Sequence, residues 1–248
     1  MRLAARTPRN VLPRESSFSG RGALNGAWGK GIETLDALHI IWDWNGTLLD
    51  DTEAALATLN IMIAERGGTP IGMPFYLDNF AFPVRPFYDR IGITAHDEDE
   101  WNAIAREYHE TYLRQPKALN RGAFAALDMA KAAGCRQSIL SALRQDLLDA
   151  QTKEYGIDGY FERICGSDNL HGASKVVRAR EFLAELRSRD ADAKFVMIGD
   201  AVHDKEVADA IGIPCVLCAV GSHAAWRLRE IAPTGDTLED AIRLALAE

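Results

Sequence analysis

The sequence predicts an α/β fold in which helices cover both faces of a parallel sheet, with a helical insertion after the first strand. Short apolar strands alternate with helices from Ala123 onward, which is typical of such a sheet. The first strand, 36–43, is continuously apolar and lacks the polar alternation of a half-exposed strand. We therefore expect a core made of 36–51 and 120–248, interrupted by a helical domain at 52–119.

At least two helices are expected in the insertion. Thr52 is expected to cap the first, whose apolar residues recur at the helical period, and Gly67 ends it. The second runs from about Asp97 to Leu113 and begins with three acidic residues, which suit the positive end of a helix dipole. The loop between them is rich in proline, glycine and aromatic residues. Because no strand is expected in this segment, the insertion is predicted to be helical.

The rest of the chain alternates helix and strand. Gly134, Gly156 and Gly212 follow three of the expected helices, and glycine readily takes the left-handed conformation that ends a helix. The expected elements are helix 123–133, strand 136–141, helix 144–155, strand 163–166, helix 174–188, strand 194–199, helix 203–211, strand 213–218 and two final helices.

The charge of the chain argues against a nucleic-acid partner. The formal net charge is -8 at pH 7, whereas a nucleic-acid surface needs clustered lysine and arginine. No apolar stretch approaches the length of a transmembrane helix, so we expect no membrane partner and a cytoplasmic location. Both a monomer and a homodimer remain open.

The first 35 residues differ in composition from the rest of the chain. They are rich in arginine, serine, glycine and proline and poor in acids, a composition that is also found in organellar transit peptides. Because they lack clear helical amphipathicity, we predict that 1–35 is a disordered basic extension or lies before the true translation start.

Polar residues stand where several of the expected strands end. Asp43 ends the first strand, Ser141 another, and Asp200 a third, with Asp204 four residues on. Lys175 opens a helix after the strand at 163–166. Ligands of open α/β sheets bind outside the carboxyl ends of the strands, so these side chains are expected to form one site. A single aspartate there is often a turn residue, but four such clusters at one edge indicate chemistry.

The residue types at this edge suit a phosphoryl group and a metal ion. Asp43 and Asp200 bring two carboxylates together, which is costly unless a cation lies between them. Mg²⁺ fits, because it takes one or two protein carboxylates and leaves room for substrate phosphate oxygens. Lys175 adds a positive charge and Ser141 a hydroxyl donor for the phosphate oxygens.

Residues 36–248 resemble the haloacid dehalogenase superfamily. The resemblance rests on the order of four features: D-x-N-G-T-L-L-D, a serine at the end of a strand, a lysine, and G-D-x-x-x-D. Within it, the sequence looks most like the phosphoglycolate phosphatase and β-phosphoglucomutase branch. The resemblance implies a Rossmann-like core, a C1 cap at 52–119, and removal of phosphate from a small phosphorylated metabolite.

The resemblance also implies roles for individual residues. Asp43 would be the nucleophile that forms an aspartyl-phosphate, a route that divides one difficult step into two. Mg²⁺ would be held by the Asp43 carboxylate, the backbone carbonyl of Asn45 and Asp200, with support from Asp204. The residues expected to contact substrate are Thr47, Ser141, Ala142, Lys175 and Arg85. Thr47 would also steady the loop. For Arg85 the alternative is an arginine in a loop exposed to solvent.

Asn45 departs from the pattern of the branch. Phosphatases of this branch carry aspartate there, which protonates the leaving oxygen and then activates water. An amide does neither near neutral pH. Three interpretations therefore stay open: a phosphatase, a hydrolase of other chemistry, and a slow or inactive phosphate-binding protein.

Overall fold

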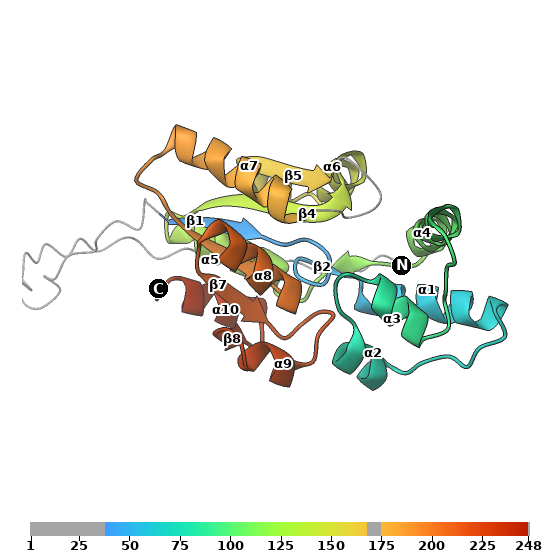
Figure 1. Ribbon diagram of the computed structural model, residues 1–248. Helices are drawn as coiled ribbons and strands as arrows, with labels where there is room; N and C mark the ends of the chain where they lie inside the picture. The colour runs from blue at the N-terminus through green and yellow to red at the C-terminus, as the bar shows by residue number, and fades with distance from the viewer. Residues whose placement is uncertain (1–37, 168–174, 248) are drawn as a thin grey trace, which may run out of the picture. The chain divides into compact units, whose positions relative to one another are not determined.

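The computed structural model describes residues 38–167 and 175–247 (Figure 1). Within these ranges it has the predicted architecture, a parallel sheet between two layers of helices. The extension predicted at 1–35 lies outside the described residues. No helix in the described part of the chain has both the length and the apolar character needed to cross a membrane.

Six strands form one sheet in the order β5-β4-β1-β6-β7-β8, and every neighbouring pair is parallel. The first strand of the sequence therefore lies near the middle, between β4 and β6. The strands are β1 (Leu38–Trp42), β4 (Arg136–Arg144), β5 (Arg163–Ser167), β6 (Lys194–Gly199), β7 (Cys215–Cys218) and β8 (Thr234–Gly235).

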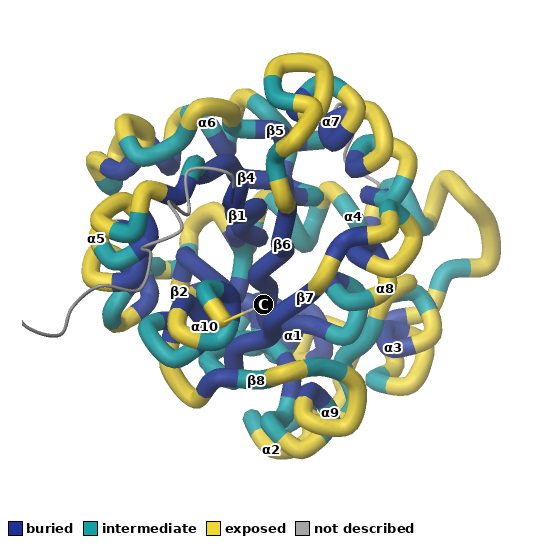
Figure 2. Tube along the Cα trace, turned by 90° about the vertical axis from the view of Figure 1, so that its left-hand side faces the viewer, coloured by how far each residue is buried: buried dark blue, intermediate teal, exposed yellow. Residues whose placement is uncertain are grey.

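The two faces of the sheet pack against different helices. Successive side chains of a strand point to opposite faces, so Trp42 joins one hydrophobic cluster and Ile41 the other. Burial on both faces explains why β1 is apolar throughout, and Figure 2 shows the central strands in dark blue. The first cluster includes residues of α5 (Ala123–Ala132), α6 (Gln145–Glu154) and α10 (Leu238–Ala245), and the second residues of α7 (Lys175–Arg189), α8 (Val202–Ile211) and α9 (Ala225–Arg229).

The insertion has its own hydrophobic cluster, in which Leu59, Met62, Tyr76, Tyr88 and Ile104 are buried. We call this segment the cap. Its helices are α1 (Thr52–Glu65), α2 (Met73–Asn79), α3 (Arg85–Arg90) and α4 (Glu98–Leu113). The domain boundaries at 51 and 120 remain predictions.

A short antiparallel pair lies where the chain enters and leaves the cap. Strand β2 (Leu49–Asp50) pairs with β3 (Ala118–Leu119), and Leu49 lies opposite Leu119. The expectation that 52–119 contains no strand is therefore wrong. Strands of two residues show no alternation that a sequence pattern could reveal, which also explains why β8 was not predicted.

Two further details differ from the prediction. Thr52 is the first residue of α1 and not its cap, and Asp51 stands at the N-cap without a side-chain capping bond. The Asp51 carboxylate instead accepts hydrogen bonds from the active-site loop, as described below. Strand β4 continues to Arg144, past the predicted end at 141, because Arg144 pairs with Ser167 after a register shift.

Candidate active site

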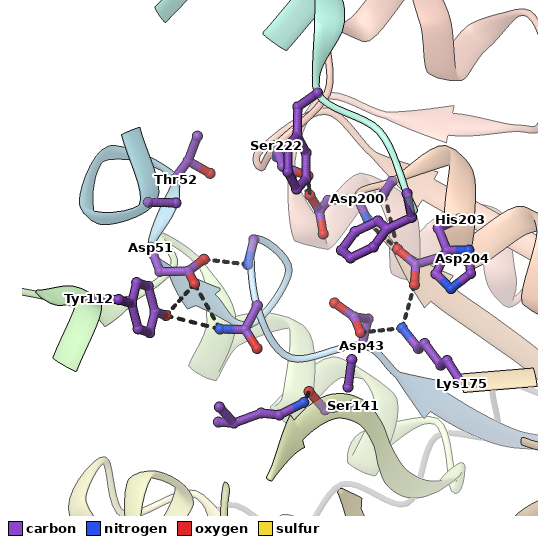
Figure 3. A pocket seen from close by; sticks show the side chains of 18 of the residues that line it. Asp43, Asp51, Thr52, Tyr112, Ser141, Lys175, Asp200, His203, Asp204 and Ser222 are labelled. Atoms are coloured by element: carbon purple, nitrogen blue, oxygen red, sulfur yellow. Dashed lines mark hydrogen bonds and ion pairs between the residues drawn. The ribbon is translucent and has the colours of Figure 1, made fainter. Parts of the chain in front are cut away.

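The predicted polar residues meet at the carboxyl edge of the sheet (Figure 3). Asp43 directly follows β1, and its backbone N–H donates to the carbonyl of Ile198 in β6 at 2.8 Å. Asp200 follows β6, and Asp204 lies in the first turn of α8. Because β1 and β6 are parallel neighbours, their ends bring these carboxylates together.

Three carboxylates gather at this edge, and one ammonium contacts two of them. Oxygen atoms of Asp43, Asp200 and Asp204 lie within 4.8 Å of one another, and all three side chains are buried. The Lys175 ammonium lies 2.5 Å from Asp43 Oδ1 and 2.6 Å from Asp204 Oδ1. Negative charge therefore exceeds positive charge in a space that water hardly reaches.

This excess is visible in the pKa values. Burial raises the pKa of Asp43 well above its usual value, and the nearby Asp204 and Asp200 add to the shift that Lys175 opposes. Burial and Asp204 likewise raise the pKa of Asp200 to about 6. Burial lowers the pKa of Lys175, but attraction to Asp204 and Asp43 outweighs this and leaves it raised.

The cluster fits a hard divalent cation. A bound cation would offset the repulsion among the three carboxylates, and oxygen ligands are those that Mg²⁺ prefers. Asp43, Asp200 and Asp204 are the residues that would hold it.

The loop after β1 is fitted around Asp200. Thr47 is fully buried, and its hydroxyl donates to Asp200 Oδ1 at 2.9 Å. The backbone N–H and the hydroxyl of Ser222 donate to Oδ2 at 2.7 and 2.6 Å. At Gly46, with φ of +77°, a Cβ would lie 2.5 Å from Asp200 Oδ2. Only glycine therefore allows the loop to approach this carboxylate.

The Asn45 side chain is held by two partners. Its amide nitrogen donates to Asp51 Oδ2 at 2.7 Å and to the Tyr112 hydroxyl, in α4, at 3.0 Å. Tyr112 donates to the same Asp51 oxygen, and the Gly46 N–H donates to Asp51 Oδ1 at 2.7 Å. Burial raises the pKa of Asp51, although these hydrogen bonds oppose the shift. Both amide hydrogens of Asn45 are thus used within the protein.

The remaining predicted residues divide into two groups. Ser141, Ala142 and Lys175 line a cavity of about 200 Å³ above Asp43. Arg85 is not among the described residues that line it. The Arg85 guanidinium instead lies 2.9 Å from Glu98 and packs over the ring of Trp101 at 5.3 Å. The structure does not bring Arg85 to the site.

The sequence model of the haloacid dehalogenase-like hydrolases matches residues 40–218. The chain belongs to this family. The match contains Asp43, Ser141, Lys175 and Asp200, so the predicted family is confirmed.

Curated relatives of this hydrolase include two named phosphoglycolate phosphatases. The protein from Caulobacter vibrioides is 27% identical over 77% of this chain and 82% of its own length. The protein from Rhodobacter capsulatus is 25% identical over 73% of this chain and 84% of its own. A solved structure of a predicted phosphatase from Clostridium acetobutylicum has a TM-score of 0.69 and covers 86% of this chain and 99% of its own, at 17% identity. That last likeness shows the fold alone, whereas family and relatives together support a phosphatase.

Sequence reasoning missed three parts of the site of this hydrolase, one of which is Ser222, the residue that donates twice to Asp200. Asp51 is the second acid of "LLDD", and only the folded loop shows that its carboxylate turns back to Asn45. The cap side of the cavity is a further part, lined by the rings of Tyr76, Phe80, Phe82, Tyr108 and Tyr112. The aromatic content of the loop before α3 was the available signal, but no pattern in it tells which rings face the cavity.

Proposed function

We propose that this protein is a Mg²⁺-dependent phosphatase that removes phosphate from a small phosphorylated metabolite through an aspartyl-phosphate at Asp43. The observation that carries the proposal is the buried Asp43 carboxylate at the cavity, beside one ammonium and two further carboxylates. The phosphatases among the curated relatives support the reaction class.

The residues of the chain suit each part of this reaction. Lys175 holds one oxygen of Asp43, and the other points away from the lysine (Figure 3). That oxygen would attack phosphorus as the bond from phosphorus to the leaving oxygen breaks, and water would then release phosphate from the aspartyl-phosphate. Mg²⁺, when bound, supplies positive charge that neutralises the phosphoryl oxygens.

Ser141 and Lys175 would also bind oxygen atoms of the phosphoryl group. Ser141 is buried and lines the cavity, and its hydroxyl oxygen accepts the Leu143 N–H at 3.1 Å, which leaves its own hydrogen to donate. Positioning and charge neutralisation are the main contributions a protein makes to phosphoryl transfer.

A second candidate, a phosphate-binding protein with slow turnover, is favoured by Asn45. Its amide hydrogens are directed to Asp51 and Tyr112, and an amide does not exchange protons near neutral pH. Positioned acid–base catalysis is typically worth about 10²–10⁴-fold, so its loss at this position would slow the release of alkoxide leaving groups.

Phosphate release from a generic aryl phosphate tests the proposal. We expect release that depends on Mg²⁺ and falls to background in Asp43→Asn, because the amide is not a nucleophile. Asp50→Asn is the control, since it removes an exposed carboxylate near the same loop and should change little. Near-wild-type release by Asp43→Asn would refute the mechanism.

A further inference from the structure

The cavity has two chemically different sides. Polar groups of the core surround Asp43, whereas the cap contributes chiefly aromatic rings. Since the phosphoryl group must reach Asp43, the rest of the same molecule has to occupy the aromatic side. The chemistry of that side therefore selects the leaving group.

The rings form a continuous wall. Tyr76 stacks on Phe80 at 4.9 Å between centroids, and Phe80 meets Phe82 edge to face at 5.3 Å. Phe82 also packs against His203, in α8, at 5.1 Å and is 41% exposed. Aromatic faces arranged in this way favour offset or edge contacts with another ring. An exposed phenylalanine at a cavity is a surface that a bound ring would cover.

The charges in the cavity disfavour an anionic leaving group. Among the described residues that line it, Lys175 is the one lysine or arginine, and it lies at the phosphoryl end of the cavity, beside Asp43 and Asp204. At the boundary between core and cap, Asp51 places a further carboxylate beside Asn45 and Tyr112. A carboxylate on the leaving group would approach Asp51 without an arginine or lysine to receive it. Such a carboxylate would be left to the histidines and hydroxyl groups of the lining, among them His203 and Tyr108.

The size of the cavity is suited to one ring. Its volume is about 200 Å³. An apolar cavity of roughly 150 Å³ in another protein holds benzene, so this volume is enough for a single six-membered ring.

We infer that the substrate of this site is the phosphate ester of an uncharged, single-ring compound, bound with its ring against Tyr76, Phe80 and Phe82. This inference rests on the proposed function and narrows it. It also separates this protein from its phosphoglycolate phosphatase relatives, because phosphoglycolate carries a carboxylate on its leaving group.

The test compares benzyl phosphate, 4-carboxybenzyl phosphate and phosphoglycolate with the Mg²⁺-loaded full chain. The two benzyl esters share the same leaving oxygen, so their difference reports the carboxylate alone. We expect kcat/KM for benzyl phosphate to exceed both others by at least about tenfold. Phosphoglycolate equal to or better than benzyl phosphate would overturn the inference.

Variants of the wall provide a second measurement. Phe82→Ala should raise KM for benzyl phosphate about tenfold and leave kcat/KM for phosphoglycolate within twofold, since the lost contact is to the ring. Phe124→Ala, an exposed phenylalanine of α5, is the matched control and should change neither. Equal losses on both substrates in Phe82→Ala would contradict a ring site.

Binding of inert analogues separates this inference from the proposed function. Benzylphosphonate and phosphonoacetate are titrated calorimetrically into the Mg²⁺-loaded protein. If no ester is hydrolysed but benzylphosphonate binds at least tenfold more tightly than phosphonoacetate, the proposed function fails and the ring site stands. If phosphate is released but phosphonoacetate binds as tightly as benzylphosphonate or more tightly, the proposed function stands and the ring site fails.

Discussion

At the scale of single residues, the pair formed by Asn45 and Asp51 is the most unusual feature of the site. An amide and a carboxylate lie 2.7 Å apart, and Tyr112 contacts both. A carboxylate at position 45 would therefore meet a second carboxylate at hydrogen-bond distance. Like charges so close disfavour the ionised forms of both, so a change at position 45 has to be made together with one at position 51.

Exchanging the two side chains tests whether the missing carboxylate limits turnover. Asn45→Asp with Asp51→Asn keeps one amide beside one carboxylate and puts the acid at position 45. We expect kcat for an alkyl phosphate such as benzyl phosphate to rise by about 10²–10⁴-fold, because the leaving oxygen then receives a proton. Asn45→Asp alone should gain less.

Asp51→Asn alone is the control for the exchange, and its kcat for benzyl phosphate should not rise. If the exchanged protein shows no gain while the wild type is already fast, Asn45 belongs to a different and complete mechanism.

At the scale of elements, the short helix α9 of the core holds α2 of the cap. Arg227 donates to the carbonyls of Leu77 and Phe80, both at 2.9 Å, where the C-terminal end of α2 leaves carbonyls without helical partners. Trp226 adds a hydrogen bond to Asp78 at 3.0 Å. This contact fixes the segment that carries Phe80 and Phe82.

Loss of this contact should loosen the aromatic wall. We expect Arg227→Ala to raise KM for benzyl phosphate several-fold and to speed amide hydrogen exchange in residues 73–82, with kcat less affected. Arg229→Ala is the matched control, because that arginine of the same helix pairs with Asp236 at the surface. Unchanged exchange in Arg227→Ala would mean that other contacts hold α2.

The elements also show which features a sequence pattern predicts. Helix α4 was predicted within one residue, because Asp97 accepts the Glu100 N–H as an N-cap and a clear apolar stripe follows. Strands β2, β3 and β8 have two residues each, too few for a period. The length of β4 depends on Arg144 pairing with Ser167, a tertiary contact that no local pattern contains.

At the scale of the whole molecule, buried histidines make stability depend on pH. Burial lowers the pKa of His39 to about 4, and its ring stacks on Phe195 and contacts the Ser138 hydroxyl at 2.8 Å. Between pH 6.5 and 4 the unfolded chain binds a proton at this position that the folded chain does not. His39 therefore contributes stability above pH 6.5 that is lost as pH falls toward 4.

His39→Gln should remove this dependence while still offering Ser138 a hydrogen bond. When pH falls from 7 to 5, we expect the unfolding free energy of the wild type to decrease by about 2 kcal/mol more than that of the variant. Urea unfolding at both pH values measures it. The comparison of two chains cancels the opposite contribution of Asp200, whose raised pKa lowers stability as pH rises. A constant difference would show that His39 does not titrate in this way.

The fold of the whole molecule decides which residues of the site could be predicted from the sequence. Asp43, Asp200 and Asp204 could be assigned to one place because parallel strands end at one edge. Phe80 and Phe82 could not, since their positions depend on how the cap folds back over that edge. The Asp51 carboxylate could not either, because only the folded loop turns it back to Asn45. Arg85 was predicted to reach the substrate, but Glu98 and Trp101 engage it elsewhere in the cap.

The central claim is that Asp43 carries the phosphoryl group during turnover. The most direct test is to mix the Mg²⁺-loaded protein with an aryl phosphate, quench in acid within the first turnovers, and map the phosphorylated peptide by mass spectrometry. Because Asn45 cannot activate water, the aspartyl-phosphate should accumulate. We predict one phosphoryl group in the peptide that contains Asp43, and none in Asp43→Asn. Phosphate release with no phosphorylated peptide, or with phosphate on another residue, would contradict the account.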